Sequence, residues 1–247
     1  MTITATQIEI ETPDGAMPAQ LWLPSLPSGP GLVLVQEIFG VSGYIRQRAA
    51  DLAELGYVVC APEVYWRLPG ADADSDAAGA AGPVDTDREP SLDEAMGLAQ
   101  QVDWAQAVSD VALAVGHLRG RLEVSGGVGL VGFCFGGGLA FNVAAVEPVE
   151  VLVSYYGSAL GSLTHLADQV TAPSLHHFGL EDGYVPVETQ DQIRAAVTPT
   201  GARFETYPGA NHAFDNPNPM FHHPEASEAA WKVTTQFLAE HLPVQPL

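Results

Sequence analysis

A cysteine flanked by glycines is the residue of this chain best suited to chemistry. Cys134 stands at the centre of the segment GFCFG (residues 132–136), after the apolar run GLVGF and before GGGLAF, which opens a helix. A strand-to-helix turn this sharp strains its central residue and leaves no space for side chains on either flank. The amide-rich start of the helix favours thiolate over thiol. The pattern predicts a nucleophilic cysteine exposed above a sheet.

Other interpretations of this region are weaker. A free cysteine is often a small buried hydrophobic residue, but glycines on both sides at a strand–helix junction make that the minority interpretation for Cys134. Gly127-x-Gly129-x-x-Gly132 matches a dinucleotide-binding pattern literally. That pattern belongs in the first strand–helix turn, whereas these glycines lie within or before a strand in the middle of the chain. Cys60, in YVVCAP, is expected to pack in the core.

A nucleophile of this kind needs a base and an acid that orients the base, and enzymes with such a turn place them in the order nucleophile, acid, histidine. Asp182 follows the strand-like segment SLHHFG, and His212 follows RFETYPG. Both are expected at the carboxyl edge of the sheet, beside the turn. Glu181 and Asp191 are alternatives to Asp182, and a purely structural role for Asp182 in a helix cap or turn stays open.

The remaining histidines do not suggest a metal site. His176 and His177 lie in an apolar, strand-like segment, where at least one is expected to be a hydrogen-bonded core residue. His222 and His223 are adjacent in a loop rich in proline and asparagine and are expected at the surface. Adjacent histidines usually diverge, and no carboxylate or cysteine lies at ligand spacing, so we expect no bound metal.

The first buried strand ends in QEIFG (residues 36–40). In hydrolases with this type of turn, that loop supplies one backbone N–H of the oxyanion hole, and the residue after the nucleophile supplies the other. Ile38 and Phe135 are therefore the expected donors. A carboxylate at Glu37 is costly to bury unless it is paired. It either orients or deprotonates the thiol, or it is a solvated loop residue.

The elements that must position these residues alternate along the chain. A hairpin over residues 8–23 comes first, and apolar strands then alternate with helices. The expected strands are 31–36, 57–62, 127–133, 149–157, 174–179 and 202–209, with helices over 46–55, 92–118, 187–196 and 225–241. This order predicts an α/β-hydrolase fold, with a mostly parallel, twisted sheet and helices on both faces. We expect one domain over residues 1–247, with an irregular acidic insertion rich in alanine and glycine at about 68–90.

Composition narrows the possible partners. The chain has 247 residues, of which 30 are acidic and 9 are lysine or arginine, giving a formal net charge of −21. Such a surface repels nucleic acid and anionic membranes, so neither is an expected partner. Two cysteines do not make a disulfide framework, and the start of the chain has no signal-peptide pattern. We expect a cytoplasmic protein that binds a small molecule, as a monomer or small homo-oligomer.

The chain resembles the dienelactone hydrolase (carboxymethylenebutenolidase) family. The matching blocks, in order, are QEIFGV (36–41), GYVVCAPEVYWR (56–67), VGLVGFCFGGGLAF (128–141), HHFGLEDGYVP (176–186) and YPGANHAF (207–214). The resemblance implies that Cys134, Asp182 and His212 form a triad, that Glu37 activates the thiol, and that no cofactor is needed. The implied reaction is the opening of an enol-lactone or small ester.

The chain departs from the family where the substrate carboxylate would bind. The resemblance implies an arginine shortly after the catalytic histidine, but Asn216 stands there. Arg67 and Arg88 are the remaining candidates for binding the substrate. A thioesterase or acyltransferase using the same cysteine, and a non-catalytic protein that binds a small ligand, are the alternative functions.

Overall fold

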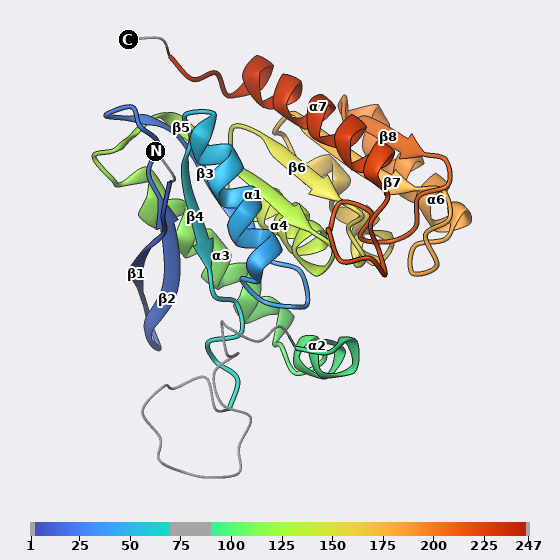
Figure 1. The fold of residues 1–247 in the computed structure, drawn as a ribbon, viewed down its shortest axis with the longest axis horizontal. Helices are drawn as coiled ribbons and strands as arrows, with labels where there is room; N and C mark the ends of the chain where they lie inside the picture. Colours follow the sequence, from blue (N-terminus) through green and yellow to red (C-terminus); the bar gives the residue numbers. More distant parts are fainter. Residues whose placement is uncertain (1–2, 70–89, 246–247) are drawn as a thin grey trace.

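The computed structural model of the chain describes residues 3–69 and 90–245. Most of the predicted insertion at 68–90, with Arg88, lies outside the described residues. One eight-stranded sheet runs through the molecule in the order β1-β2-β4-β3-β5-β6-β7-β8 (Figure 1). The strands are β1 (Thr6–Thr12), β2 (Gly15–Trp22), β3 (Gly29–Val35), β4 (Val58–Pro62), β5 (Val124–Phe133), β6 (Leu152–Tyr155), β7 (Ser174–Gly179) and β8 (Arg203–Tyr207).

The sheet is parallel except at one edge. β1 and β2 form the predicted hairpin, and β2 pairs antiparallel with β4, whereas every later pairing is parallel. All residues of β3, β4, β6 and β7 are buried. Strands buried on both faces are apolar throughout rather than alternating, which is why their sequence runs were recognisable. The predicted α/β fold with a mostly parallel sheet is confirmed.

Helices cover both faces of the sheet (Figure 1). The principal helices are α1 (Gly43–Glu54), α2 (Leu92–Ala99), α3 (Trp104–Arg119), α4 (Phe135–Val146), α6 (Val187–Val197) and α7 (Pro224–His241), with a short α5 (Leu160–Leu163). Helices α1 and α7 lie on one face, and α3 and α4 lie on the other. None of the helices in the described ranges combines the length and apolar composition needed to cross a membrane.

The helical region predicted over residues 92–118 consists of two helices, α2 and α3. Ser91 and Glu94 form a reciprocal capping box at the start of α2, and the Asp103 carboxylate accepts the Gln106 N–H at the start of α3. Side chains of this kind satisfy the free N–H groups at a helix start. The Asp103 cap therefore marks the start of α3, after α2 has ended at Ala99.

The strands and helices meet most closely around the turn that carries Cys134. A Cβ added to Gly132 would lie 2.1 Å from the Gly136 carbonyl oxygen, and one added to Gly136 would lie 2.3 Å from the Val35 carbonyl oxygen. Both distances are far inside van der Waals contact, and the opposing atoms are backbone atoms that cannot turn aside. The glycines are required by space, since they let α4 approach β3 and β5.

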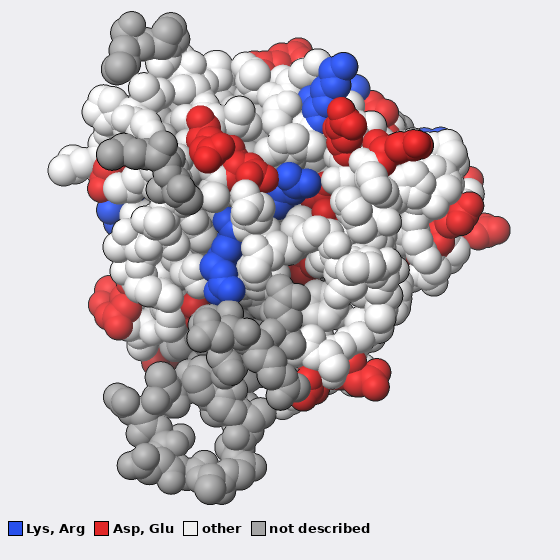
Figure 2. All heavy atoms as spheres, in the orientation of Figure 1, with Lys and Arg blue, Asp and Glu red and all other residues white. Residues whose placement is uncertain are grey.

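Acidic side chains are spread over much of the face shown in Figure 2, and basic ones gather in few places. This distribution matches the formal net charge of −21. Long-range repulsion of anions is screened beyond about 8 Å at physiological ionic strength. The surface charge therefore affects the approach of an anionic ligand more than its binding inside a cavity.

The glycine requirement gives a stability prediction. We expect Gly132→Ala to lower the free energy of unfolding by about 2–3 kcal/mol, because the backbone around the turn must shift. Gly116→Ala is the matched control, since a Cβ at this position in α3 meets nothing within 4 Å. The control should be neutral or stabilising by up to about 1 kcal/mol. Urea unfolding measures both, and equal effects would contradict the packing argument.

Candidate functional site

Cys134 lies at the junction of β5 and α4 in a backbone conformation that side chains rarely adopt, with φ 53° and ψ −115°. The surrounding backbone holds it there. Its N–H donates to the Tyr155 carbonyl oxygen, and its own carbonyl oxygen accepts the N–H groups of Gly137, Gly138 and Ser158. Such strain persists only where the surroundings determine the conformation. The result is a thiol fixed above the carboxyl edge of the sheet.

His212 and Asp182 complete a continuous hydrogen-bonded line with this thiol. His212 Nε2 lies 3.0 Å from the Cys134 sulfur, and its Nδ1 lies 2.8 Å from Asp182 Oδ2. The other oxygen of Asp182 accepts the backbone N–H groups of Tyr184 and Val185, both at 2.8 Å. The carboxylate is thereby fixed on the side of the imidazole opposite the sulfur, although the three residues come from three different loops.

The electrostatics of this line favour a charged imidazole. Burial disfavours the imidazolium, but the Cys134 sulfur and the Asp182 carboxylate outweigh burial and raise the pKa of His212 to about 10. The two groups on either side of the ring therefore favour its protonated form. An imidazolium beside a sulfur stabilises the thiolate, which is the reactive form of cysteine.

The other candidate acids, and the second cysteine, lie away from His212. Glu181 and Asp191 are exposed, whereas Asp182 is 3 % exposed and bonded to His212. Cys60 is fully buried in β4, and burial raises the pKa of its thiol to about 12. Among the acids weighed from the sequence, the structure therefore brings Asp182 to the histidine.

Three of the other histidines lie in the core or at a helix start. His176 and His177 are both fully buried in β7, and burial lowers the pKa of each. His177 bonds to Tyr207 and Thr234, whereas neither ring nitrogen of His176 has a hydrogen-bond partner. His223 accepts the Ala226 N–H at the start of α7. Within residues 3–69 and 90–245, no group of three or more histidine, cysteine or acidic side chains is arranged to hold a metal ion.

Glu37 is buried rather than solvated, with 1 % of its surface exposed. Asn216 Nδ2 donates to one carboxyl oxygen at 2.8 Å, and the Tyr156 hydroxyl contacts the other at 3.2 Å. Burial raises the pKa of Glu37 to about 7, while the hydrogen bonds from Asn216 and Tyr156 and the nearby His212 act to lower it. Asn216 stands where the resemblance implied an arginine. It is therefore a neutral partner of the Glu37 carboxyl group.

A buried polar network extends from Glu37 toward α1. The hydroxyls of Tyr156 and Tyr44 lie 3.2 Å apart, and Tyr44 donates to Asp215 Oδ2 at 2.5 Å. Arg48 donates to both oxygens of Asp215, at 2.8 and 2.7 Å. A bidentate arginine–carboxylate pair of this kind fixes the position of both side chains. The network joins the loops after β3, β6 and β8 to α1.

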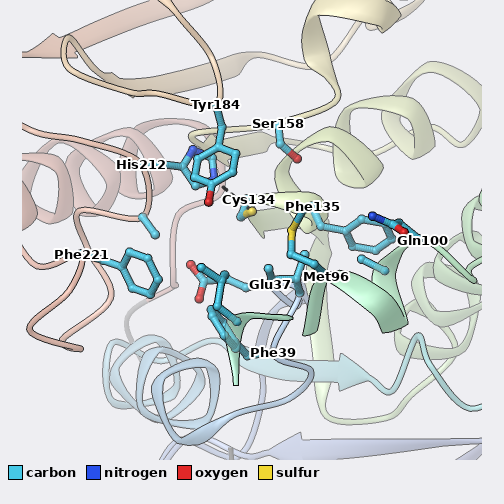
Figure 3. A pocket seen from close by; sticks show the side chains of 14 residues that line it. Glu37, Phe39, Met96, Gln100, Cys134, Phe135, Ser158, Tyr184, His212 and Phe221 are labelled. Carbon is cyan, nitrogen blue, oxygen red and sulfur yellow. Dashed lines mark hydrogen bonds between the residues drawn. The ribbon is translucent and has the colours of Figure 1, made fainter. Parts of the chain in front are cut away.

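A cavity of about 240 Å³ opens in front of the thiol (Figure 3). In Figure 3, the aromatic rings and Met96 surround the space next to Cys134 and His212. The lining is Glu37, Ile38, Phe39, Leu92, Met96, Ala99, Gln100, Cys134, Phe135, Ser158, Tyr184, His212, Ala213 and Phe221. The loop after β3, helix α2 and the loop between β8 and α7 contribute most of these residues.

Both residues expected as oxyanion donors line this cavity. Phe135 is the first residue of α4, where backbone N–H groups have no acceptor within the helix. The carbonyl oxygen of Ile38 accepts the Tyr65 hydroxyl at 2.8 Å, which fixes the peptide chain at this position. The two residues come from different elements, Ile38 from the loop after β3 and Phe135 from the start of α4.

Arg67 does not line the cavity, contrary to its expected position near the mouth. Its Nε and Nη2 donate to the two oxygens of the buried Asp110, both at 2.8 Å, and its Nη1 donates to Asp14. The guanidinium also lies 4.2 Å from the ring centroid of Trp66. These contacts hold Arg67 between the β1–β2 turn and α3, so it supports the fold.

Sequence reasoning missed the aromatic surroundings of His212. The rings of Tyr156 and Tyr184 lie on it, with centroids 5.2 and 5.0 Å from that of the imidazole. Tyr156 follows β6 directly and Tyr184 lies two residues beyond Asp182, so position at the carboxyl edge was the available signal. The contribution of α2 to the cavity had no comparable signal.

The sheet order, the strained turn and the aligned cysteine, histidine and aspartate define a protein of the α/β-hydrolase class. Residues 17–242 match the model of the dienelactone hydrolase family, and the chain belongs to that family. It is a hydrolase of this family. A carboxymethylenebutenolidase from Pseudomonas sp. strain P51 is 31% identical over 231 residues, covering 93% of this chain and 92% of the relative.

A second carboxymethylenebutenolidase, from Pseudomonas putida, is 35% identical over 188 residues, which is 75% of each chain. Among solved structures, a Klebsiella pneumoniae protein assigned as a dienelactone hydrolase superposes with a TM-score of 0.82. It has 25% identity, and the match covers 97% of this chain and 100% of that one. A dienelactone hydrolase-like phosphotriesterase, P91, shares the fold at a TM-score of 0.73 and 21% identity, over 98% of this chain and all of P91.

The geometry predicts how the thiol reacts. At pH 6, we expect iodoacetamide to alkylate Cys134 at least about tenfold faster in the wild type than in His212→Ala, because the imidazolium stabilises the thiolate. The deficit should shrink as the pH rises to 9. Glu181→Gln, which removes an exposed carboxylate next to Asp182, should react like the wild type. Equal rates in wild type and His212→Ala at pH 6 would contradict the assignment, and mass spectrometry identifies the modified cysteine.

Proposed function

We propose that the protein hydrolyses an ester-type bond, in an enol-lactone or small ester, with Cys134 as the nucleophile. The observation that carries the proposal is the hydrogen-bonded line from the Cys134 sulfur through His212 to Asp182, at 3.0 and 2.8 Å. It opens onto the cavity that such a substrate would occupy. Membership of the dienelactone hydrolase family supports the same reaction class.

In the first half of the proposed reaction, the Cys134 thiolate attacks the carbonyl carbon and forms a carbon–sulfur bond. The oxygen then carries a negative charge, which the N–H groups of Ile38 and Phe135 stabilise. Collapse of this intermediate breaks the carbon–oxygen bond of the ester, and the His212 imidazolium gives its proton to the departing oxygen. The acyl group remains on sulfur as a thioester.

In the second half, the now neutral His212 takes a proton from water as the water oxygen attacks the thioester carbon. The carbon–sulfur bond breaks, the acid is released, and the thiolate–imidazolium pair is restored. Asp182 accepts the Nδ1 hydrogen throughout and thereby presents Nε2 to the sulfur. No cofactor enters these steps, and the atoms balance with one water consumed per bond cleaved.

A thiolate suits esters, enol-lactones and thioesters better than amides, because an amine is a poor leaving group. A thioesterase would follow the same steps with a thiol leaving group, and an acyltransferase would replace water with another acceptor. We place ester or lactone hydrolysis first because it agrees with the family. A protein that only binds a ligand has no need of an imidazole at hydrogen-bonding distance from the thiol.

The test is a panel of enol-lactones, aryl esters and thioesters. We expect Cys134→Ala to lower kcat/KM at least about 10³-fold, and Asp182→Asn about 10²–10⁴-fold, because both belong to one catalytic unit. Glu181→Gln should keep wild-type activity, and circular dichroism checks that each variant is folded.

The outcomes separate the alternatives. Transfer products formed with added alcohols or thiols would indicate an acyltransferase, and preference for thioesters would indicate a thioesterase. Undiminished turnover in Cys134→Ala would refute the cysteine mechanism. A wild type that cleaves nothing at any pH and does not react with alkylators would point to a binding protein.

A further inference from the structure

The side chains around the thiol are suited to one chemical class of substrate. On the proposed function, we infer that the acyl group entering this cavity is uncharged and apolar, not one that bears a carboxylate. The walls next to Cys134 are Phe39, Met96, Phe135 and Phe221 (Figure 3). An ionised carboxylate placed among them would lose its hydration without gaining a charged partner, which is costly.

The cations of the described chain are positioned away from this cavity. The sequence holds 9 lysine and arginine residues, and all except Arg88 are described. None of the described ones lines the cavity. Five form ion pairs with acidic side chains elsewhere, among them Arg48 with Asp215 and Arg67 with Asp110. These five arginines of the described residues therefore stabilise the fold through ion pairs and do not line the cavity.

The polar groups that do face the cavity also disfavour an anion. Glu37 lines it, and its hydrogen-bond partners are the neutral Asn216 and Tyr156. An anionic substrate would meet a carboxyl group rather than a cation there. Cys134 and His212 form a hydrogen-bonded pair. The imidazole of His212 already has a carboxylate partner in Asp182. Apart from Glu37, Cys134 and His212, the polar side chains in the lining are the uncharged Gln100, Ser158 and Tyr184. The cavity therefore offers mainly contact to carbon chains and rings, and no lysine or arginine of the described residues lines it to pair with a carboxylate.

Two esters of equal acyl length test this inference. p-Nitrophenyl pentanoate and mono-p-nitrophenyl glutarate share the leaving group and differ by a terminal carboxylate. We expect kcat/KM to favour the pentanoate at least about tenfold. The preference should persist when the ionic strength is raised to about 0.5 M, where long-range repulsion by the protein surface is screened.

Variants locate the origin of the preference. Met96→Arg adds a cation to the α2 wall at a side chain that is 36 % exposed, and should shift the preference toward the glutarate. Met96→Gln, polar but uncharged, is its control, and Arg88→Ala should keep the wild-type preference. A wild type that prefers the glutarate and loses that preference in Arg88→Ala would overturn the inference. Cleavage of neither ester would instead count against the proposed hydrolase.

An independent observation concerns the proton on Glu37. Three contacts join four oxygens in a chain: Glu37 Oε1 to Tyr156, Tyr156 to Tyr44, and Tyr44 to Asp215, at 3.2, 3.2 and 2.5 Å. Each contact needs one hydrogen, and the two tyrosines supply only two. Asp215 supplies none, since both of its oxygens accept hydrogen bonds, from Arg48 and the Ser227 hydroxyl.

The missing hydrogen can come from Glu37. We propose that Glu37 is a neutral carboxylic acid in the resting protein. An ionised Glu37 would accept the Tyr156 hydroxyl, whereas the neutral acid reverses this bond and donates to Tyr156, which then donates to Tyr44, which donates to Asp215. Its second oxygen still accepts from Asn216. The charged groups around it are His212 and Asp215 from the β8–α7 loop and Arg48 from α1, and none bonds to it directly. Glu37 is then a positioning residue that orients Tyr156, whose ring centroid lies 5.2 Å from that of His212.

Glu37→Gln tests this assignment, because the glutamine amide reproduces a neutral acid with one donor and one acceptor. Burial raises the pKa of Glu37 from 4.5 to about 7, so folding favours its protonated form. That contribution is complete below pH 4.5 and is lost as the pH rises through 7. We therefore expect the melting temperature of Glu37→Gln, relative to the wild type, to rise between pH 5 and pH 8.

Glu181→Gln removes an exposed carboxylate and should show no such change relative to the wild type. The infrared spectrum of the wild type at pH 6 should contain a protonated carboxyl band that Glu37→Gln lacks. A wild-type spectrum without that band, or a stability difference from wild type that is constant between pH 5 and 8, would overturn the proposal.

Discussion

The close approach of α4 to the sheet governs the rest of the site. The carbonyl groups of Val35 and Gly136 occupy the space that side chains at Gly136 and Gly132 would need, so backbone packs directly on backbone. This contact forces the chain to reverse within one residue and holds Cys134 at a positive φ. The sulfur consequently occupies a fixed position to which the loops after the other strands can be fitted.

Those loops start from neighbouring parallel strands and meet at one edge. The acid follows β7 and the base follows β8, and each is secured by backbone hydrogen bonds close to its strand end. Asp182 accepts two main-chain N–H groups, and the Glu181 N–H donates to the Ala210 carbonyl oxygen, joining the two loops. The alignment of cysteine, histidine and aspartate therefore depends on the sheet itself more than on contacts between the three side chains.

Local patterns explain which parts of this arrangement could be predicted from the sequence. The glycines beside Cys134 and the strand ends before Asp182 and His212 are visible over a few residues, so the fold and the positions of these side chains were predictable. The network behind Glu37 was not, because its contacts span the chain: Tyr44 and Asp215 are 171 residues apart.

The position of the Arg67 side chain could not be predicted for the same kind of reason. Its position after β4 suggested the mouth of the site, but its partner Asp110 lies 43 residues further along the chain, on α3. A salt bridge between distant segments leaves no periodic signal, and the direction of an arginine side chain cannot be inferred from the strand that precedes it. Within residues 92–118, by contrast, the boundary between α2 and α3 has a local cause, the Asp103 cap.

The outer wall of the cavity is attached to the core less extensively than its floor is. The catalytic candidates are attached to the buried sheet, whereas Leu92, Met96 and Ala99 come from α2, a two-turn helix with its own cap and one fully buried residue, Ala95. Substitutions on α2 disturb little of the core. Point changes on this helix can therefore alter which molecules are accepted without rebuilding the machinery beneath, which gives a lineage a short evolutionary route to new substrates.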